Sequence, residues 1–288
     1  MAEQISASGY SLTAIQITPG IFEGQFEIFV EGSTVLLAIH CNVGVRFIGL
    51  RNTNFTCIST IAQGSGGWRT MALPHPWLAG FNTAEASCCF WLDSDTTFLC
   101  TLLQKDTLLQ SVNSHTLEIL QHCNVAYPDL YRHKQWEAEF INRFAGNKPD
   151  KCFFELTDQI FETAEFKTVP VTTDAQVSII KKLPEFLTRL INGENISVKQ
   201  AADEFFLSQS GFKNIILDIT GLTPKQLITN TKTEGVLQML REPLRRRSCG
   251  VSDTLMSIAT FYSWSEASAR KNLRDLTRQM PASLLVKH

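Results

Sequence analysis

The front part of the chain, from Tyr10 to about Lys105, carries short apolar runs at the spacing of β-strands. Each run is rich in Val, Ile, Phe and Thr, and turn residues such as Glu31-Gly32-Ser33 separate one run from the next. The pattern predicts strands at Gln25–Val30, Thr34–His40, Val43–Leu50, Thr56–Ile61, Ala84–Leu92 and Thr96–Leu102. Short strands at this spacing indicate a sandwich or barrel of the jelly-roll type.

From Asp106 to about Lys167 the apolar positions recur at helical spacing. One helix is predicted between Thr107 and Cys123, where Thr116 fills the turn that lacks an apolar residue. Two more are predicted at Tyr131–Phe144 and Lys151–Phe166.

The stretch Lys167–Asp174 contains Pro170 and β-branched residues and is predicted to link two domains. The boundaries are placed at residues 1–167 for the front domain, 168–175 for the linker and 176–288 for the C-terminal domain. Pro184, inside the first helical pattern of the C-terminal domain, predicts a new helix start or a kink. The fold class is therefore α+β, with an all-α C-terminal domain.

The stretch Ile196–Pro224 has the layout of a helix-turn-helix. Ala202 lies where the two helices cross, and a close crossing requires a small residue. Ser208 can cap the second helix, and Phe212, Ile215 and Ile216 would hold its inner face against the first. The outward polar positions are candidates for contacts with base edges and phosphates. They are Gln209, Ser210, Lys213 and Asn214.

These residues resemble the DNA-binding unit of AraC/XylS-type transcription regulators, in which a long helix joins two helix-turn-helix motifs. Gly221–Pro224 match the family's Gly-x-Ser-Pro turn, and Lys232 stands where the family has a basic residue in the connecting helix. The resemblance covers roughly Leu183–Leu285 and implies a long helix over Thr223–Arg241. Phe206 replaces the family's turn glycine, and because a bulky residue tolerates a positive φ poorly, a rebuilt turn is expected there.

A second, less regular motif follows, with a supporting helix expected over Asp253–Phe261 and a reading helix over Ser265–Arg278. The family's closing Gly-x-x-Pro is represented only by Pro281, with Arg278 in place of the glycine. The candidate DNA contacts of this motif are Ser265, Glu266, Arg270, Lys271 and Arg274. The preceding basic run, Arg245, Arg246 and Arg247, either binds phosphate or is a solvated charge run.

The resemblance also implies a cupin-like β-barrel for the front domain, because sensor domains of this family are often of that type. Its least regular stretch, Gln63–Trp77, holds four candidate ligand contacts, and the alternative is a hairpin loop with aromatics packed on the barrel rim. The four are Trp68, Arg69, His75 and Trp77. Cupin enzymes hold a metal with a His-x-His pair, a Glu and a distant His. Here His40 and His75 stand alone, so no metal and no cofactor is expected.

Composition and charge agree with two domains. The chain has 288 residues, 44% of them hydrophobic, and a net charge of −2. Residues 1–180 hold 10 Lys and Arg against 18 Asp and Glu, whereas residues 181–288 hold 16 against 10. An acidic N-terminal part and a basic C-terminal part fit a sensor domain joined to a nucleic-acid-binding module. The alternative is an ordinary asymmetry of surface charge.

The sequence shows no signal peptide and no membrane span, so a cytoplasmic or nucleoid-associated protein is expected. Its eight cysteines lack zinc-type spacing and are expected to be reduced; most are predicted to be small core residues, with redox sensing as the alternative.

The resulting hypothesis is a sequence-specific DNA-binding transcription regulator. An enzyme is not expected, since paired catalytic carboxylates, a nucleophile elbow and a metal set are all missing from the sequence. The resemblance implies double-stranded DNA as partner, and further RNA polymerase, a small-molecule effector in the barrel, and a second copy of the chain. The helices after the barrel would form the dimer surface or simply cover the barrel. The alternative function is a protein-interaction module whose degenerate helix-turn-helix no longer reads DNA.

Overall fold

A computed structural model describes residues 10–31, 34–51, 54–69, 71–82, 87–145, 153–168, 172–241 and 251–279. The chain divides into two compact units. The first consists of Met1–Ala14 and Glu23–Thr173, and the second of Ile15–Phe22 and Asp174–His288. The first unit is rich in sheet and the second is helical, so the fold is α+β. Within the described ranges, no helix is both long enough and apolar enough to cross a membrane.

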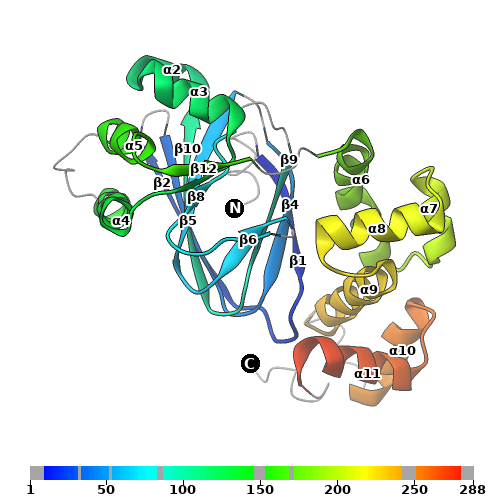
Figure 1. The fold of residues 1–288 in the computed structure, drawn as a ribbon. Helices are drawn as coiled ribbons and strands as arrows, with labels where there is room; N and C mark the ends of the chain where they lie inside the picture. Colours follow the sequence, from blue (N-terminus) through cyan, green and yellow to red (C-terminus); the bar gives the residue numbers. More distant parts are fainter. Residues whose placement is uncertain are drawn as a thin grey trace. The chain divides into compact units, whose positions relative to one another are not determined.

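The strands of the first unit form two sheets (Figure 1). In spatial order, the five-stranded sheet contains β1 (Tyr10–Gln16), β4 (Val45–Arg51), β9 (Ser87–Leu92), β6 (Gly66–Trp68) and β7 (Met71–Ala72). The seven-stranded sheet contains β12 (Glu165–Lys167), β11 (Val125–Tyr127), β8 (Leu78–Ala79), β5 (Phe55–Gln63), β10 (Thr96–Gln104), β3 (Thr34–Cys41) and β2 (Gly24–Glu31). The described strands thus make two separate layers, and the closed cupin-like barrel is not confirmed.

Alternation along the strands decides which side chains fill the space between the layers. On β10, Phe98 and Cys100 pack in a core cluster to which both sheets contribute, including Phe90 of β9. Their neighbours Leu99 and Leu103 belong to a second cluster, on the opposite face of the seven-stranded sheet. Successive residues of a strand point to opposite faces, so this central strand is apolar on both.

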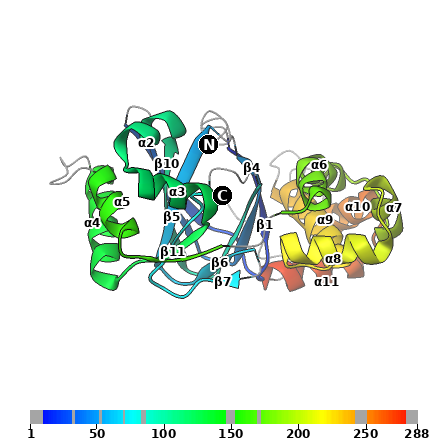
Figure 2. The ribbon, with the colours of Figure 1, turned by 45° about the horizontal axis from the view of Figure 1, so that its top comes forward.

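The outer face of the seven-stranded sheet is covered by helices (Figure 2). They are α2 (Lys105–Ser111), α3 (Ser114–His122), α4 (Leu130–Phe144) and α5 (Phe153–Phe161). The single helix predicted between Thr107 and Cys123 is wrong, because Asn113 interrupts it and caps α3 by accepting a hydrogen bond from the Thr116 amide. The predicted third helix ends early, at Phe161, and Glu165–Lys167 forms strand β12 instead, paired with β11.

The cysteines of the described ranges form no disulfide bond. Five of the six are buried, and Cys123 is half-buried. Burial raises the pKa of Cys41 to about 11, which disfavours the reactive thiolate. These positions therefore behave as small core residues; Cys152 and Cys249 lie outside the described ranges.

The second unit contains six helices in its described residues. They are α6 (Asp174–Ile191), α7 (Val198–Glu204), α8 (Gln209–Thr220), α9 (Pro224–Arg241), α10 (Val251–Phe261) and α11 (Glu266–Thr277). Helix α6 continues through Pro184, so a new helix start there is wrong. Leu183, Phe186 and Leu187 are buried on both sides of the proline, and this packing outweighs the lost backbone hydrogen bond.

Candidate nucleic-acid interface

The first helix-turn-helix is built from α7 and α8. A capping box starts α7, in which Ser197 accepts from the Gln200 amide at 3.2 Å and the Gln200 side chain accepts from the Ser197 amide at 2.8 Å. Ala202 is fully buried, as its place at the helix crossing requires. The turn closes where the Leu207 amide donates to the Ala202 carbonyl at 3.0 Å.

Helix α8 begins at its predicted cap, where the Ser208 hydroxyl accepts from the Gly211 amide at 3.1 Å. Phe212 and Ile216 are buried on its inner face, and the ring of Phe205 stacks on that of Phe212 with centroids 5.4 Å apart. The inner-face assignment from the sequence is therefore confirmed for these two residues, whereas Ile215, the third predicted position, is only half-buried. The helix ends at Gly221, whose φ of 71° is the left-handed conformation of a helix C-cap.

The expected rebuilding of the turn at Phe206 is wrong. Phe206 keeps the left-handed conformation, with φ 56°, although it is not glycine. Its side chain is 88% exposed, and the Lys182 ammonium lies 5.3 Å from the ring centroid. The turn geometry is thus retained, and the chain bears the strain of a bulky residue in this conformation.

The four predicted reading positions of the first motif, Gln209, Ser210, Lys213 and Asn214, are exposed. Three of them, all but Asn214, line one surface hollow together with the first turn of α9. That turn contributes Lys225, an exposed cation that the sequence analysis did not select. The sequence could have indicated this residue, because Lys225 directly follows the Gly221–Pro224 turn at a helix N-terminus. Backbone amides at such a position favour anions.

The second motif repeats the first, position by position. Ser263 has φ 57° at the place of Phe206, and the Trp264 amide donates to the Ala259 carbonyl at 2.8 Å. Ser265 caps α11 by accepting from the Ser268 amide at 3.2 Å. The small residue at the crossing, Ala259, is again fully buried.

The repetition extends to the ends of the two reading helices. Thr220 donates to the Ile216 carbonyl at 2.6 Å, and Thr277 donates to the Leu273 carbonyl at 2.7 Å. The residue after each threonine is left-handed, and Arg278, with φ 61°, stands where the first motif has glycine. The second motif is irregular in sequence, yet its backbone repeats that of the first motif. Pro281 lies outside the described ranges.

The candidate contacts on α11 are not equivalent. Lys271 and Arg274 are exposed, whereas the Arg270 Nε donates to the Glu266 carboxylate at 2.8 Å, one helical turn away. An intrahelical pair of this kind offsets both charges. Arg274 makes a longer and more exposed contact, with its Nε 4.0 Å from Asp275 Oδ1, so Lys271 and Arg274 carry most of the positive charge that the candidate contacts of this helix offer. Ser265 is engaged as the helix cap. Arg245, Arg246 and Arg247 lie outside the described ranges.

Helix α9 joins the two motifs, and its central residues pack inside the second unit. Lys232 is only 3% exposed and donates to the Asn195 side-chain oxygen at 2.9 Å. Burial lowers the pKa of this lysine. The Tyr262 hydroxyl donates to the Ile191 carbonyl, and it passes α9 where Gly235 has no side chain. The basic residue that the family resemblance placed in this helix is therefore buried in the unit and does not face outward.

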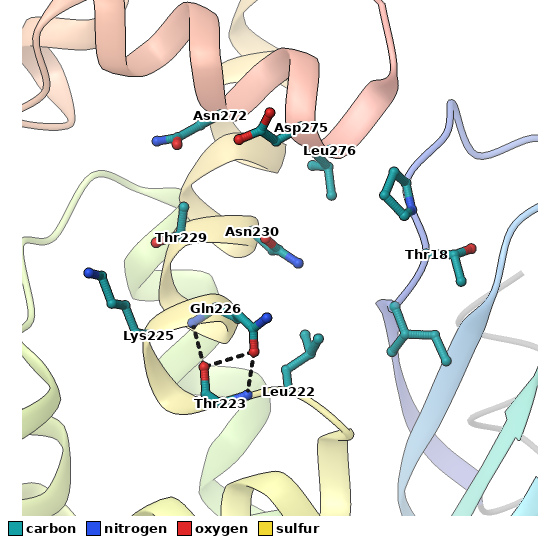
Figure 3. A pocket seen from close by; sticks show the side chains of 12 residues that line it. Thr18, Leu222, Thr223, Lys225, Gln226, Thr229, Asn230, Asn272, Asp275 and Leu276 are labelled. Atoms are coloured by element: carbon teal, nitrogen blue, oxygen red, sulfur yellow. Dashed lines mark hydrogen bonds between the residues drawn. The ribbon is translucent and has the colours of Figure 1, made fainter.

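A pocket of about 400 Å³ lies beside the N-terminal part of α9 (Figure 3). Its walls come from Ile17–Pro19, α9 and α11, all within the second unit. Eight of the twelve lining residues are polar, and Thr229 and Asn230 on α9 lie opposite Asn272 and Asp275 on α11. The sequence did not predict these four residues as part of a site, because none of them directly follows a recognisable motif.

The four predicted ligand contacts of the first unit have different surroundings. Trp68 and Trp77 are buried in the core between the sheets, which fits the alternative of packed aromatics. Arg69 donates to Ser87 and to Thr172, and His75 is exposed. His75 instead lies beside His133 and Glu137, residues that the sequence analysis did not select.

No protein-family model matches the sequence, and no curated protein matches it significantly. Solved structures of AraC-like regulators do resemble it. The AraC-like transcriptional activator CuxR has 6% identity and a TM-score of 0.42, over 75% of this chain and 82% of CuxR. ToxT from Vibrio cholerae O395 has 10% identity and a TM-score of 0.31, over 96% of this chain and 97% of ToxT. Unsaturated fatty acid-bound ToxT from Vibrio cholerae strain SCE256 has 12% identity and a TM-score of 0.29, over 89% and 96%. At such scores, function has to be argued from the chain's own residues.

Proposed function

We propose that this chain is a sequence-specific, DNA-binding transcription regulator of the AraC/XylS type. The observation that carries the proposal is the repeated backbone of the two motifs. Each has a buried alanine at the crossing, a left-handed turn residue, a serine cap and a threonine-closed end. Two reading helices held in the same way at the two ends of one connecting helix are the arrangement that contacts with successive major-groove faces require.

In this proposal α8 and α11 enter successive faces of the major groove, about 34 Å apart along the duplex. On α8, Gln209 and Asn214 supply the bidentate amides that recognise adenine, and Lys213 supplies a cation for guanine or phosphate. Lys271 and Arg274 contribute the charge of α11. Lys225 would bind phosphate next to the first motif, aided by the amides at the start of α9.

The first unit would act as the sensor. A small ligand bound there changes DNA binding only if it binds two conformations of the protein unequally. Trp68, Arg69, His75 and Trp77 stay the candidate contacts for such a ligand in a cupin-like sandwich. RNA polymerase and a second copy of the chain are the further partners proposed, with the helices that cover the sheet as a candidate dimer surface.

The test is DNA binding by the purified protein, first to the sites found by genome-wide mapping in the source cell. Lys213→Ala and Asn214→Ala should each weaken binding to those sites by about 1–3 kcal/mol, and Asn214→Ala should also relax the preferred sequence. Lys181→Ala is the matched control, because Lys181 is an exposed lysine on α6, outside both reading helices. It should leave binding unchanged.

The result that would contradict the proposal is a folded protein with no preferred sites, or site binding that both α8 substitutions leave intact. The first outcome would favour a protein-interaction module. The pairing of Glu266 with Arg270 also favours that alternative, because it offsets positive charge on the second reading helix. Loss of binding in Lys181→Ala alone would place the DNA contact elsewhere on the unit.

A further inference from the structure

Three side chains with metal-binding atoms meet between helix α4 and the segment that precedes β8. They are His75, His133 and Glu137, and their donor atoms all lie within 4.8 Å of one another. The side chains of His133 and Glu137 are 0% and 7% exposed, whereas His75 is open to solvent. The two imidazole rings meet edge to face, with centroids 4.7 Å apart.

Neighbouring hydrogen bonds determine which nitrogen of His133 carries the proton. The Thr60 hydroxyl donates its hydrogen to the Trp77 carbonyl at 2.7 Å. The same hydroxyl oxygen lies 2.7 Å from His133 Nε2, so it must accept a hydrogen bond from that nitrogen. Nε2 is therefore protonated, and Nδ1 of the neutral ring presents a lone pair.

That lone pair faces a carboxylate oxygen. His133 Nδ1 and Glu137 Oε1 are 3.6 Å apart, and both are buried without a hydrogen-bond partner. Lys134 bonds only the other carboxylate oxygen, Oε2, at 2.8 Å. Two buried electron-pair donors that face each other are costly unless a cation lies between them.

We propose that His75, His133 and Glu137 bind a divalent transition-metal ion of the zinc type. Zinc binds imidazole nitrogen and carboxylate oxygen at about 2.0–2.2 Å, which places two ligand atoms of a tetrahedral site roughly 3.4 Å apart. The 3.6 Å between His133 Nδ1 and Glu137 Oε1 matches that edge. His75 completes the set by a small side-chain movement, which its exposure permits, and a fourth position is open to water or a further ligand.

The surroundings of His133 agree with this role. A metal-binding histidine characteristically donates its other ring N–H to a fixed acceptor, which orients the ring. Thr60 and the Trp77 carbonyl provide this acceptor pair. The proposed site lies beside α4, whose Trp136 and Phe140 pack in the core on the outer face of the seven-stranded sheet. It is thus distinct from the space between the two sheets, and a bound ion would tie α4 to the segment before β8.

The test is titration of the full-length, untagged protein with CoCl₂ and, separately, ZnCl₂. Co²⁺ should bind in a 1:1 ratio with the visible absorption of a four-coordinate ion, lack the near-ultraviolet band of thiolate ligation, and be displaced by Zn²⁺. Zn²⁺ should also raise the Tm. His75→Asn and Glu137→Gln should each weaken Co²⁺ binding by at least about tenfold, as loss of one ligand implies. His122→Asn, an exposed histidine of α3, is the matched control and should bind like the parent.

His75→Asn alters an exposed side chain, so loss of binding there does not reflect misfolding, and the Tm of each variant without metal verifies this. The proposal is overturned if the parent protein takes up no ion, if binding survives both substitutions, or if the thiolate band appears and assigns the ion to cysteine. An equal loss of Co²⁺ affinity in His122→Asn would mean that the ion binds adventitiously at the surface and would also overturn the proposal. None of these outcomes depends on whether the protein binds DNA.

Discussion

At the scale of single residues, the two turns show how a fold can impose a conformation that the residue itself disfavours. Phe206 and Ser263 adopt nearly the same φ, 56° and 57°, although one is bulky and the other small. In each motif the turn is held by a backbone hydrogen bond to the buried alanine and by the serine that caps the next helix. These contacts are common to both turns, so they determine the backbone conformation. The side chain determines only the free-energy cost of that conformation.

Replacing Phe206 with glycine should therefore stabilise the protein. A left-handed non-glycine residue costs about 1–2 kcal/mol, and part of that gain is offset by the greater freedom of glycine in the unfolded chain. Because the ring is 88% exposed, little burial is lost, and we expect a net gain of about 0.5–1 kcal/mol by denaturant unfolding. Ser263→Gly should act in the same direction. A loss of stability in Phe206→Gly would mean that the ring beside Lys182 contributes more than its exposure indicates.

At the scale of elements, α9 holds the second unit together because it is buried along much of its length. Leu227, Val236 and Leu240 are buried, and so is Lys232, despite its charge. Gly235 weakens the helix by its own propensity, yet a Cβ at this position would overlap the Tyr262 hydroxyl and lie 2.8 Å from the Ile191 carbonyl oxygen. The glycine thus lets the second motif approach the end of α6.

Gly235→Ala should destabilise the second unit although alanine is the better helix former. The propensity gain is about 1 kcal/mol, and overpacking against the Ile191 carbonyl should exceed it, for a net loss of about 1–2 kcal/mol in thermal or denaturant unfolding. Tyr262→Phe removes the overlapping hydroxyl and provides the control. In that background Gly235→Ala should cost less, and strict additivity of the two substitutions would argue against the close approach.

At the scale of the whole molecule, the course of the chain does not follow the order of its two units. Ile15–Phe22 belongs to the second unit, although the residues on both sides of it belong to the first. The Gly20 amide donates to the Leu276 carbonyl at 2.7 Å, near the end of α11. Ile21 packs against the cluster formed by α9, α10 and α11. The second motif therefore depends on a segment far from it in sequence.

Ile21→Ala should lower the stability of the second unit by about 1 kcal/mol, because it removes half-buried methyl and methylene groups from that cluster. Hydrogen exchange should become faster in α9–α11 and stay unchanged in β3, β5 and β10. Phe22→Ala is the control, since Phe22 is 48% exposed and should have the smaller effect. Faster exchange confined to the strands would contradict the assignment of this segment.

The sequence by itself determined the features that depend on neighbours along the chain. The strands β2, β3, β5 and β10 follow from short runs rich in Val, Ile, Phe and Thr between turn residues, and the Ser208 cap and the buried Ala202 follow from spacings of a few residues. The reading positions were placed on an exposed helix face for the same reason. Local periodicity and short-range hydrogen bonds suffice for such features, because the competing contacts lie within one or two turns.

Only the tertiary structure decided the features that join distant segments. The three-residue strands β11 and β12 are too short to show a period, and they exist because they pair with each other and β11 with β8. The sequence shows His133 and Glu137 one helical turn apart, but their meeting with His75 depends on the packing of α4 against the sheet. The two layers in place of a closed barrel have the same origin. Each rests on contacts whose free energy exceeds the local preference, and such contacts leave no pattern in the sequence.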